Sequence, residues 1–333
     1  MNSTEPKSAH AVLRASPETV VWGAIPADRT PVLRIRSGDT VVIETVSQQP
    51  LNNEDPATFF DAAGIEPQQI LPEAIAIYRQ VKKSPPGGPH VLTGPVHIEG
   101  AASGDMLEVR VLDVAFRVPY GVNGIGPGSG VLPDLLSARV APVIRLDLER
   151  RVALFAGGTE VPLAPFMGIM SVAPPPERAP VSTKPPGEWG GNIDFKHLVA
   201  GSKLYLPVFN EGALFYTGDG HAAQGDGEVD GATIEISLAP TLQFVVHKRA
   251  GKRMKWPRAE DAAYDYVMGM DEDLDLALKE AVRESVEFIQ RRAGVTAAEA
   301  YALSSFSVDF RIAEAVNLVK MVYGVIPKKL FCA

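Results

Sequence analysis

Short apolar runs divided by turn residues fill most of the chain and predict β-strands. Residues 32–36 and 40–46 alternate or run apolar, and a Ser-Gly-Asp turn at 37–39 separates them. The same Ser-Gly-Asp turn stands at residues 103–105, directly before the apolar run 106–114. A glycine in a tight turn followed by a β-rich run is typical of a hairpin. Further runs that predict strands lie at residues 143–148, 151–155, 203–209, 213–217, 232–238, 242–248 and 306–312.

Helical periodicity is convincing only near the C-terminus. Apolar positions recur with the helical period over residues 274–289, behind Asp271, which can cap the first turn. Gly294 predicts the end of this helix. Thr296 and Glu299 then form a capping-box pattern for a short second helix. The balance predicts a mainly β fold, with some α/β character, that carries one long C-terminal helix.

Two segments, residues 120–133 and 173–191, carry too much glycine and proline for regular structure. They either connect subdomains or form loops that line or cover a site, and the sequence gives the two interpretations nearly equal weight. Composition does not change across them. We therefore expect a single domain over residues 1–333, with any subdomain boundaries near 120–135 and 173–190.

The charge balance and the cysteine content exclude several classes of protein. Lys plus Arg number 32 against 40 for Asp plus Glu, which gives a formal net charge of −8. Nucleic acid is therefore not expected as a partner, since phosphate binding needs clustered cations. Cys332 is the single cysteine, which excludes an intramolecular disulfide and a cysteine-based metal cluster. Because no apolar stretch reaches about 18 residues and no signal-peptide pattern occurs, we expect no membrane partner and a cytoplasmic location.

The familiar catalytic motifs are absent from the sequence. It contains no G-x-S-x-G nucleophile elbow, no P-loop and no H-E-x-x-H. The glycine-rich run at residues 124–128 lacks the third glycine of a dinucleotide-binding loop and precedes no helical pattern. Any chemistry must therefore use carboxylates, histidine, hydroxyl groups or a metal.

The segment 190–228 contains an unusual density of polar side chains. Over its last ten residues, glycine and alanine separate three carboxylates, an imidazole and an amide, which belong to Asp219, His221, Gln224, Asp226 and Glu228. Asp219 and His221 are two positions apart, so on extended backbone they face the same side. A carboxylate and an imidazole together suit Zn²⁺ or a similar divalent ion. The alternative is a solvated glycine-rich loop whose acidic residues cap turns, and the residues alone weigh the two equally.

The remaining histidines give weaker signals. His90 lies in a turn rich in glycine and proline and is either a ligand or a surface residue. His97 and His247 lie in strand-like runs and are expected to be core or face residues. His197 follows Asp194 by three positions and either joins a metal site or has a structural role.

The run GGNIDFKHLVAGSKLYLPVFNEGALFYTGDGHAAQGDGEV, at residues 190–229, resembles the signature region of the acetamidase/formamidase family of amidohydrolases. Residues 94–114, 127–134 and 307–328 support the resemblance, which spans nearly the whole chain. It implies hydrolysis of a short linear amide, such as formamide or acetamide, to the carboxylate and ammonia. It also implies a largely β fold, sandwich-like or a partly open barrel, that assembles as a homo-oligomer.

The resemblance places the polar centre of the family at Asn192, Asp194, Asp219, His221, Gln224, Asp226 and Glu228. Our hypothesis takes Asp194, Asp219 and His221 as ligands of a divalent metal. Zinc is the expected metal, and it would lower the pKa of a bound water towards about 7.

The other polar residues are expected to transfer protons or to bind the substrate. Glu228 is expected to act as base towards the water and then to pass the proton to the departing nitrogen. Asp226 is placed with it as a catalytic candidate. Asn192, Gln224 and His90 are expected to bind the amide.

Two alternatives stay open. In the first, the chain is a hydrolase of another small C–N compound, such as a urea-like, formamidino or longer acyl amide. In the second, it is a non-catalytic small-molecule binding protein on the same scaffold. The Ala/Pro-rich stretch at residues 171–187 departs from the family pattern, so the resemblance leaves the size of the substrate open.

Overall fold

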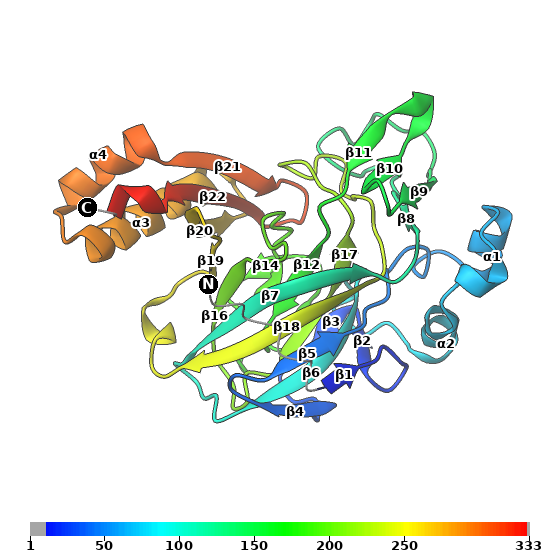
Figure 1. Cartoon of the computed structure of the whole chain (residues 1–333), viewed down its shortest axis with the longest axis horizontal. Coiled ribbons are helices and arrows are strands. Elements are labelled where there is room, and N and C mark those ends of the chain that lie inside the picture. Colours follow the sequence, from blue (N-terminus) through cyan, green and yellow to red (C-terminus); the bar gives the residue numbers. More distant parts are fainter. Residues whose placement is uncertain (1–10, 332–333) are drawn as a thin grey trace.

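A nine-stranded sheet is the largest element of the computed structural model, which describes residues 11–331 (Figure 1). Cys332 lies outside the described residues. All neighbouring strands of this sheet pair antiparallel except the first two, which are parallel. In spatial order the strands are β1 (Ala11–Leu13), β5 (Thr40–Ile43), β18 (Leu238–His247), β7 (Met106–Phe116), β16 (Lys203–Pro207), β19 (Arg258–Glu260), β20 (Tyr264–Asp271), β22 (Lys320–Pro327) and β21 (Asp309–Glu314).

A second sheet packs against the middle of the first. The rings of Phe215, in the second sheet, and Phe244, in β18, meet edge to face with centroids 4.9 Å apart, and both are fully buried. Two facing β-layers that share an apolar interior form a sandwich-like core. The second sheet runs β14 (Pro186–Gly187), β15 (Gly190–Asn192), β12 (Phe166–Ser171), β17 (Phe215–His221), β6 (Val91–Glu99) and β2 (Val20–Trp22), and β4 (Leu33–Arg36) pairs parallel with β6.

A smaller, antiparallel sheet stands apart from these layers, at the upper right of Figure 1. Its strands are β11 (Glu160–Pro162), β10 (Val152–Leu154), β9 (Val143–Asp147) and β8 (Tyr120–Val122). The short strands β13 (Val181–Ser182) and β3 (Ala24–Ile25) form a separate antiparallel pair.

Two short helices, α1 (Pro56–Ala62) and α2 (Pro72–Gln80), contradict the expectation that helix is confined to the C-terminal region. Proline occupies the first position of each, where its missing N–H costs nothing. The Asp55 side chain accepts a hydrogen bond from the N–H of Ala57 and so caps α1. Helices of seven and nine residues show too few turns for an apolar period to stand out, so the sequence pattern misses them.

The long C-terminal helix is confirmed as α3 (Leu274–Ala293), and α4 (Ala297–Ser307) follows with the expected capping box. The N-cap of α3 is Asp273 rather than Asp271, because the Asp273 carboxylate accepts from two backbone N–H groups of the first turn. Gly294 ends α3 in the left-handed conformation, as expected. Within residues 11–331, no helix combines the length and apolar character that crossing a bilayer requires.

The mainly β fold class is confirmed, and most of the expected strands form. The expected strand at 232–238 is wrong: residue 235 makes only single bridges, to Val122 and His221, and β18 begins at Leu238. The expected strand at 213–217 forms two residues later and extends to His221. Residues 120–122, expected to be irregular, form β8 because they pair with β9.

Candidate functional site

Four acidic side chains and one imidazole meet in the interior beside β17. Asp219 and His221 lie on β17 itself, Asp194 follows β15, and Glu228 and Glu235 come from the segment between β17 and β18. Each of the five residues is at most 8% exposed. Ligand-type atoms of Asp194, Asp219 and His221 lie within 4.8 Å of one another, and those of His221, Glu228 and Glu235 form a second such group. We call these five residues the acidic cluster.

Three carboxylates of the acidic cluster have backbone in the left-handed region. Their φ angles are 41° at Asp194, 59° at Asp219 and 45° at Glu228. A side chain in this region is strained, so the fold must hold these residues there against a local cost of about 1–3 kcal/mol each. Such strain gathers at functional sites, and the burial of the same residues distinguishes this cluster from a solvated turn.

Gly168, on β12, leaves the space that the acidic cluster occupies. A Cβ atom at this position would lie 2.4 Å from Oδ1 of Asp194, 2.7 Å from Oδ2 of Asp219 and 2.8 Å from Cε1 of His221. Any other residue would therefore displace the carboxylates and the imidazole from their present positions.

Gln224 fixes the orientation of the His221 ring. Its amide nitrogen donates to the backbone oxygen of Asp194 (2.7 Å), so its Oε1 accepts from Nδ1 of His221 (2.9 Å). In the neutral ring, the Nε2 atom of His221 then carries the lone pair, 3.4 Å from Oδ2 of Asp219 and 3.5 Å from Oε2 of Glu235. This is the arrangement of a metal-ligating histidine, whose second nitrogen donates to a fixed acceptor.

Three buried polar atoms of the cluster have no hydrogen-bond partner among the described residues: Oδ1 of Asp194, Nε2 of His221 and Oε2 of Glu228. Buried polar atoms are normally paired, because an unpaired one costs its full desolvation energy. Carboxylate oxygens and an imidazole nitrogen are the donor set that zinc and similar divalent cations prefer. The residues therefore fit a divalent cation.

Further contacts anchor the other carboxylate oxygens of the acidic cluster. Asn317 donates its side-chain N–H to Oδ2 of Asp194 at 2.5 Å. The side-chain nitrogen of Gln48 lies 2.8 Å from both Oδ1 of Asp219 and Oε2 of Glu235. These amides hold the carboxylates with their remaining oxygens turned toward the cluster.

The pKa values in the cluster show how strongly the buried charges interact. Burial, reinforced by the carboxylates of Glu228 and Asp219, raises the pKa of Asp194 well above its ordinary value. Burial is also the main reason that the pKa of Glu228 rises to about 8. For His221, burial acts in the opposite direction, but the neighbouring carboxylates of Glu235 and Asp219 outweigh it and raise the pKa. A cation in the cluster would lower all three pKa values, because it stabilises the carboxylates and repels a protonated imidazole.

His90 is buried, with 6% of its surface exposed, so its interpretation as a surface residue is wrong. Its Nδ1 donates to the backbone oxygen of Thr183 (3.0 Å). In the neutral ring, Nε2 then carries a lone pair, and it lies 3.7 Å from Oδ2 of Asp219. His90 therefore faces the edge of the acidic cluster.

Two expected site residues do not join the cluster. The Asp226 carboxylate accepts a hydrogen bond from the Tyr323 hydroxyl (2.8 Å) and pairs with Lys196 (3.0 Å). Asn192, on β15, is buried and its Oδ1 lacks a partner, but no described hydrogen bond links it to the cluster.

The other histidines have structural positions. His197 stacks on Tyr266 and has its Nε2 3.1 Å from the Tyr323 hydroxyl, so it does not reach the acidic cluster. His97 and His247 lie on strands, β6 and β18, as expected.

Sequence reasoning missed several residues that build the site. Glu235 interrupts the apolar run 232–238, so a charged residue inside an apolar run was the available signal. Gln48 and Asn317 gave none, because they reach the cluster only through the tertiary fold.

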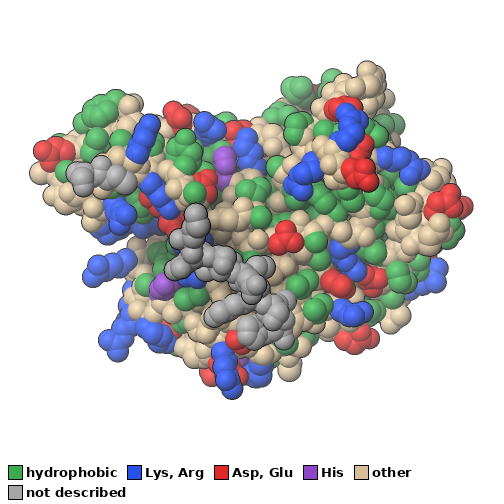
Figure 2. Space-filling model, in the orientation of Figure 1, with side chains coloured by type: hydrophobic (Ala, Val, Ile, Leu, Met, Phe, Trp, Pro, Cys, Tyr) green, Lys and Arg blue, Asp and Glu red, His purple; other side chains and the backbone are tan. Residues whose placement is uncertain are grey.

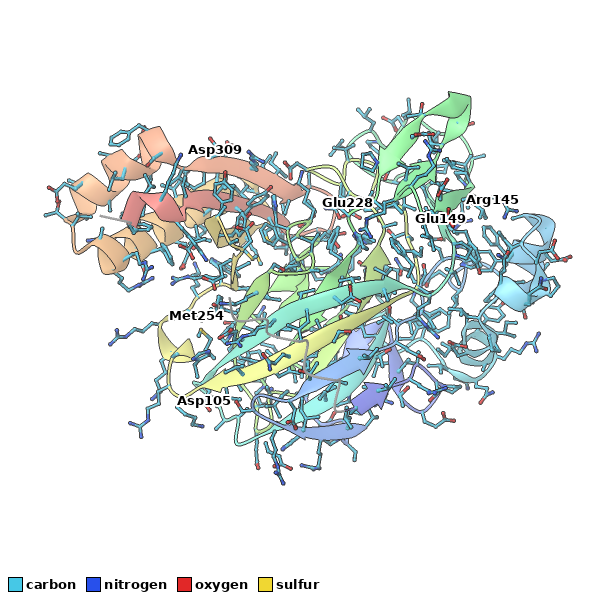
Figure 3. The ribbon with its side chains drawn as sticks, in the orientation of Figure 1. Asp105, Arg145, Glu149, Glu228, Met254 and Asp309 are labelled. Atoms are coloured by element: carbon cyan, nitrogen blue, oxygen red, sulfur yellow. The ribbon has the colours of Figure 1, made fainter. Side chains whose placement is uncertain are left out.

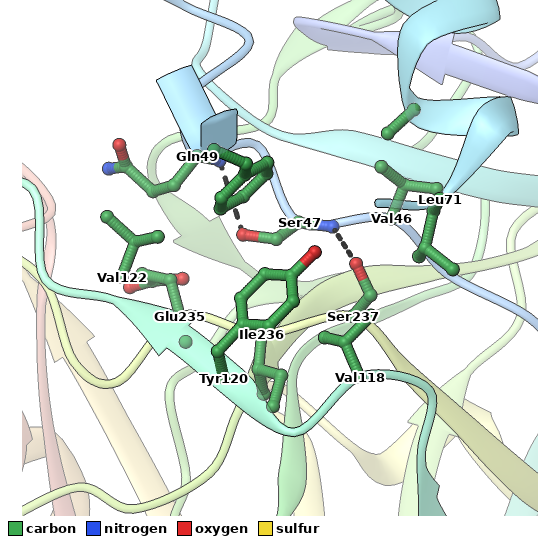
Figure 4. A pocket seen from close by; sticks show the side chains of 13 residues that line it. Val46, Ser47, Gln49, Leu71, Val118, Tyr120, Val122, Glu235, Ile236 and Ser237 are labelled. Atoms are coloured by element: carbon green, nitrogen blue, oxygen red, sulfur yellow. Dashed lines mark hydrogen bonds between the residues drawn. The ribbon is translucent and has the colours of Figure 1, made fainter. Parts of the chain in front are cut away.

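A small pocket lies beside Glu235, between β8 and the segment that contains Ser47 (Figure 4). Ser47 accepts a hydrogen bond from the N–H of Gln49 and donates its own N–H to Ser237 across the pocket. The volume of about 20 Å³ is enough for about one water molecule. An organic ligand therefore needs another route to the cluster.

A cleft of about 550 Å³ provides that route. Both Gln224 and Glu228 line it, and Figure 3 shows Glu228 between the β8–β11 sheet and the tip of β21 and β22. Because Glu228 belongs to the acidic cluster and Gln224 contacts His221, the cleft lies directly beside the cluster.

Comparisons with known proteins identify the family to which the chain is similar. The model of the acetamidase/formamidase family matches residues 78–179 and 176–333. An acetamidase of Mycolicibacterium smegmatis is 28% identical over 200 residues, which make up 42% of this chain and 49% of that protein. A formamidase of Methylophilus methylotrophus is 26% identical over 196 residues, 42% of this chain and 47% of that protein. The matched part thus spans about half the length of these curated relatives.

The likeness to a solved structure extends over nearly the whole chain. The crystal structure of an acetamidase from Bacillus halodurans superposes with a TM-score of 0.79 and 29% sequence identity. The superposition covers 96% of this chain and 98% of the other.

Proposed function

The chain belongs to the acetamidase/formamidase family, and from this premise we propose that it hydrolyses a linear amide to the carboxylate and ammonia at the acidic cluster. The observation that carries the proposal is the convergence of three buried, unpartnered atoms, Oδ1 of Asp194, Nε2 of His221 and Oε2 of Glu228. Of these three residues, Glu228 also lines the cleft.

Amide hydrolysis sets three chemical requirements. The carbonyl is a poor electrophile, so the attacking water must lose a proton and the developing oxyanion must be stabilised. The nitrogen is a poor leaving group and needs a proton as it departs.

Asp194, Asp219 and His221 would hold a divalent cation, as the sequence analysis expects. A bound divalent cation supplies a Lewis acid that acidifies water and polarises a carbonyl oxygen. The chain's own contribution is to fix the three ligand atoms. Gln224 serves this purpose by holding the His221 ring, so we assign it to positioning rather than to substrate contact.

Glu228 is the residue that we assign to proton transfer. Glu228 lines the cleft and its buried Oε2 atom has no partner, so its carboxylate would take a proton from water and deliver it to the amide nitrogen. Burial raises its pKa to about 8, close to the pH at which both transfers must occur. Asp226, held by Tyr323 and Lys196, is less suited to that role.

His90 and Asn192 remain candidates for substrate contact. In the neutral ring, Nε2 of His90 would accept a hydrogen bond from the N–H of an amide bound beside it, at the edge of the cluster where Nε2 lies 3.7 Å from Oδ2 of Asp219. The unpartnered Oδ1 of buried Asn192 is also an acceptor.

A non-catalytic binding protein is the second candidate function. Such a protein needs a pocket but no unpartnered buried carboxylate at its floor, so Glu228 favours an enzyme. Hydrolysis of another small C–N compound uses the same groups and is separated from amide hydrolysis only by the choice of substrate.

Ammonia release from formamide and acetamide tests the proposal, with metal content measured on the same samples. We expect activity in the wild type, loss of activity and metal in His221→Ala, and loss of activity with metal retained in Glu228→Gln. Glu54→Gln, an exposed position, is the matched control. Asp226→Asn shows separately whether Asp226 transfers protons.

Full activity in both His221→Ala and Glu228→Gln would refute the site. A wild type that is folded and metal-loaded but hydrolyses no amide would favour the binding protein.

A further inference from the structure

The cleft above the acidic cluster has mainly apolar walls. Ile144, Phe155 and Val161 contribute side chains from the β8–β11 sheet and its connections, and Val229 and Ile234 contribute them from the segment after β17. Figure 2 shows the outline of the molecule indented between the lobe of the C-terminal helices and the lobe of the β8–β11 sheet, where Figure 3 places Glu228. These walls offer a ligand apolar contact rather than hydrogen bonds.

Most polar side chains of the lining are already paired within the chain. The side-chain nitrogen of Asn123 donates to Asp230 and to the backbone oxygen of Thr233, both at 3.1 Å. Asp226 accepts from the hydroxyl of Tyr323. A ligand in the cleft would therefore compete with existing hydrogen bonds at these positions.

The floor of the cleft differs from its walls. Both ends of the Gln224 amide are bound, to His221 and to Asp194, whereas Glu228 lines the cleft and has an unpartnered side-chain oxygen buried directly behind the lining. The cleft thus combines one reactive carboxylate with an apolar surface.

The cleft is much larger than the smallest amides. Formamide has three non-hydrogen atoms, so its volume is about two to three times the ~30 Å³ share of a water molecule. A volume of about 550 Å³ lies instead in the range of pockets that hold larger organic ligands.

We propose that the substrate is an amide with an apolar substituent of several carbons, which packs against Phe155, Val161 and Ile234 while the amide group lies at Glu228. This inference rests on the proposed function, because it names the substrate class of the same site. Each methylene that leaves water for such a wall should raise kcat/KM about threefold to fourfold.

A chain-length series tests the inference. Ammonia release is measured for formamide, acetamide, butanamide and hexanamide, and kcat/KM should rise from acetamide to hexanamide. Amine release from N-butylacetamide shows whether the apolar walls hold the acyl side or the nitrogen side of the substrate.

Two variants change the walls without touching the cluster. Ala164→Phe fills the cleft from an exposed position. It should lower kcat/KM for hexanamide at least tenfold while leaving kcat/KM for formamide within twofold of the wild-type value. Phe155→Ala removes a half-exposed side chain from the wall and should also reduce the preference for hexanamide over formamide. Ala298→Phe, on the exposed face of α4, is the matched control and should change kcat/KM for neither substrate.

The outcomes separate this inference from the proposed function. A series that is flat or falls with chain length, together with N-butylacetamide hydrolysed no faster than acetamide, overturns the inference and leaves the function intact. An Ala164→Phe variant in which kcat/KM falls equally for formamide and hexanamide also overturns the inference. Absence of hydrolysis for every amide overturns the proposed function, and this inference with it.

Discussion

Nδ1 of His221 lies 2.9 Å from Oε1 of Gln224, and this hydrogen bond determines which nitrogen of the imidazole is available. Gln224 donates its own N–H to the backbone oxygen of Asp194, so its oxygen accepts and His221 Nδ1 carries the proton. In the neutral ring, Nε2 then faces Asp219 and Glu235 with its lone pair. Gln224 is thus a positioning residue for a candidate metal ligand.

Gln224→Leu removes both hydrogen bonds at similar side-chain volume. We expect the affinity for zinc to fall about 10–100-fold, because the imidazole loses its fixed tautomer and orientation. Titration of the metal-free protein with zinc, against a competing chelator, measures this change. Gln224→Glu keeps the acceptor for Nδ1 of His221 and loses the donor to Asp194. Its affinity for zinc should therefore lie between those of the wild type and Gln224→Leu. Equal affinities in all three proteins would show that Gln224 does not position His221.

Glu260 makes the stability of the protein depend on pH. Burial alone would raise the pKa of this carboxyl, but Lys203 and Lys328 outweigh it and lower the pKa from 4.5 to about 2. A lowered pKa contributes stability that is fully present above pH 4.5 and is lost as the pH falls towards about 2. After allowance for solvent screening, we expect Glu260→Gln to cost about 1–2 kcal/mol of unfolding free energy at pH 7.

Urea unfolding at two pH values checks the sign of this effect. The difference between wild type and Glu260→Gln should shrink by more than half between pH 7 and about pH 3. A difference that stays constant over this range would mean that the ion pairs are not its source.

The fold could be predicted from sequence wherever a local pattern was sufficient. The period-two runs gave β7 and β16, and the cap and glycine signals gave α3 and α4. Pattern failed where tertiary pairing decides the outcome. Residues 232–238 look like a strand, but residue 235 turns its side chain into the acidic cluster and makes only single bridges.

The candidate site was predictable in part for the same reason. Asp219 and His221 face one side because they lie two apart on β17, which the sequence alone implies. The distance from Gln48 to Asp219 along the chain is 171 residues, and no local pattern connects them. Glu235 could have been noticed as a charge within an apolar run, since a buried carboxylate needs a partner or a cation.

Gly269, on β20, allows α3 to pack closely against the large sheet. A Cβ atom here would lie 2.1 Å from the backbone nitrogen of Ala281 and 2.4 Å from the backbone oxygen of Ala277. Because helix backbone cannot move aside locally, Gly269→Ala should push α3 away from β20 and cost about 2–3 kcal/mol of unfolding free energy. Urea unfolding measures the cost, and a loss below about 0.5 kcal/mol would show that the contact relaxes freely.

Gly168→Ala provides the sharpest test of the acidic cluster, with Gly269→Ala as its matched control. Both changes add one methyl group to a crowded strand, but only the first would touch Asp194, Asp219 and His221. We expect Gly168→Ala to lower zinc content and to reduce ammonia release at least a hundredfold, because the new Cβ displaces the ligand atoms. Gly269→Ala should lose stability yet keep its zinc content and kcat under conditions where both variants are folded. Equal losses of activity in the two variants would mean that Gly168 acts only through stability, and the cluster would then lose its claim to be the catalytic centre.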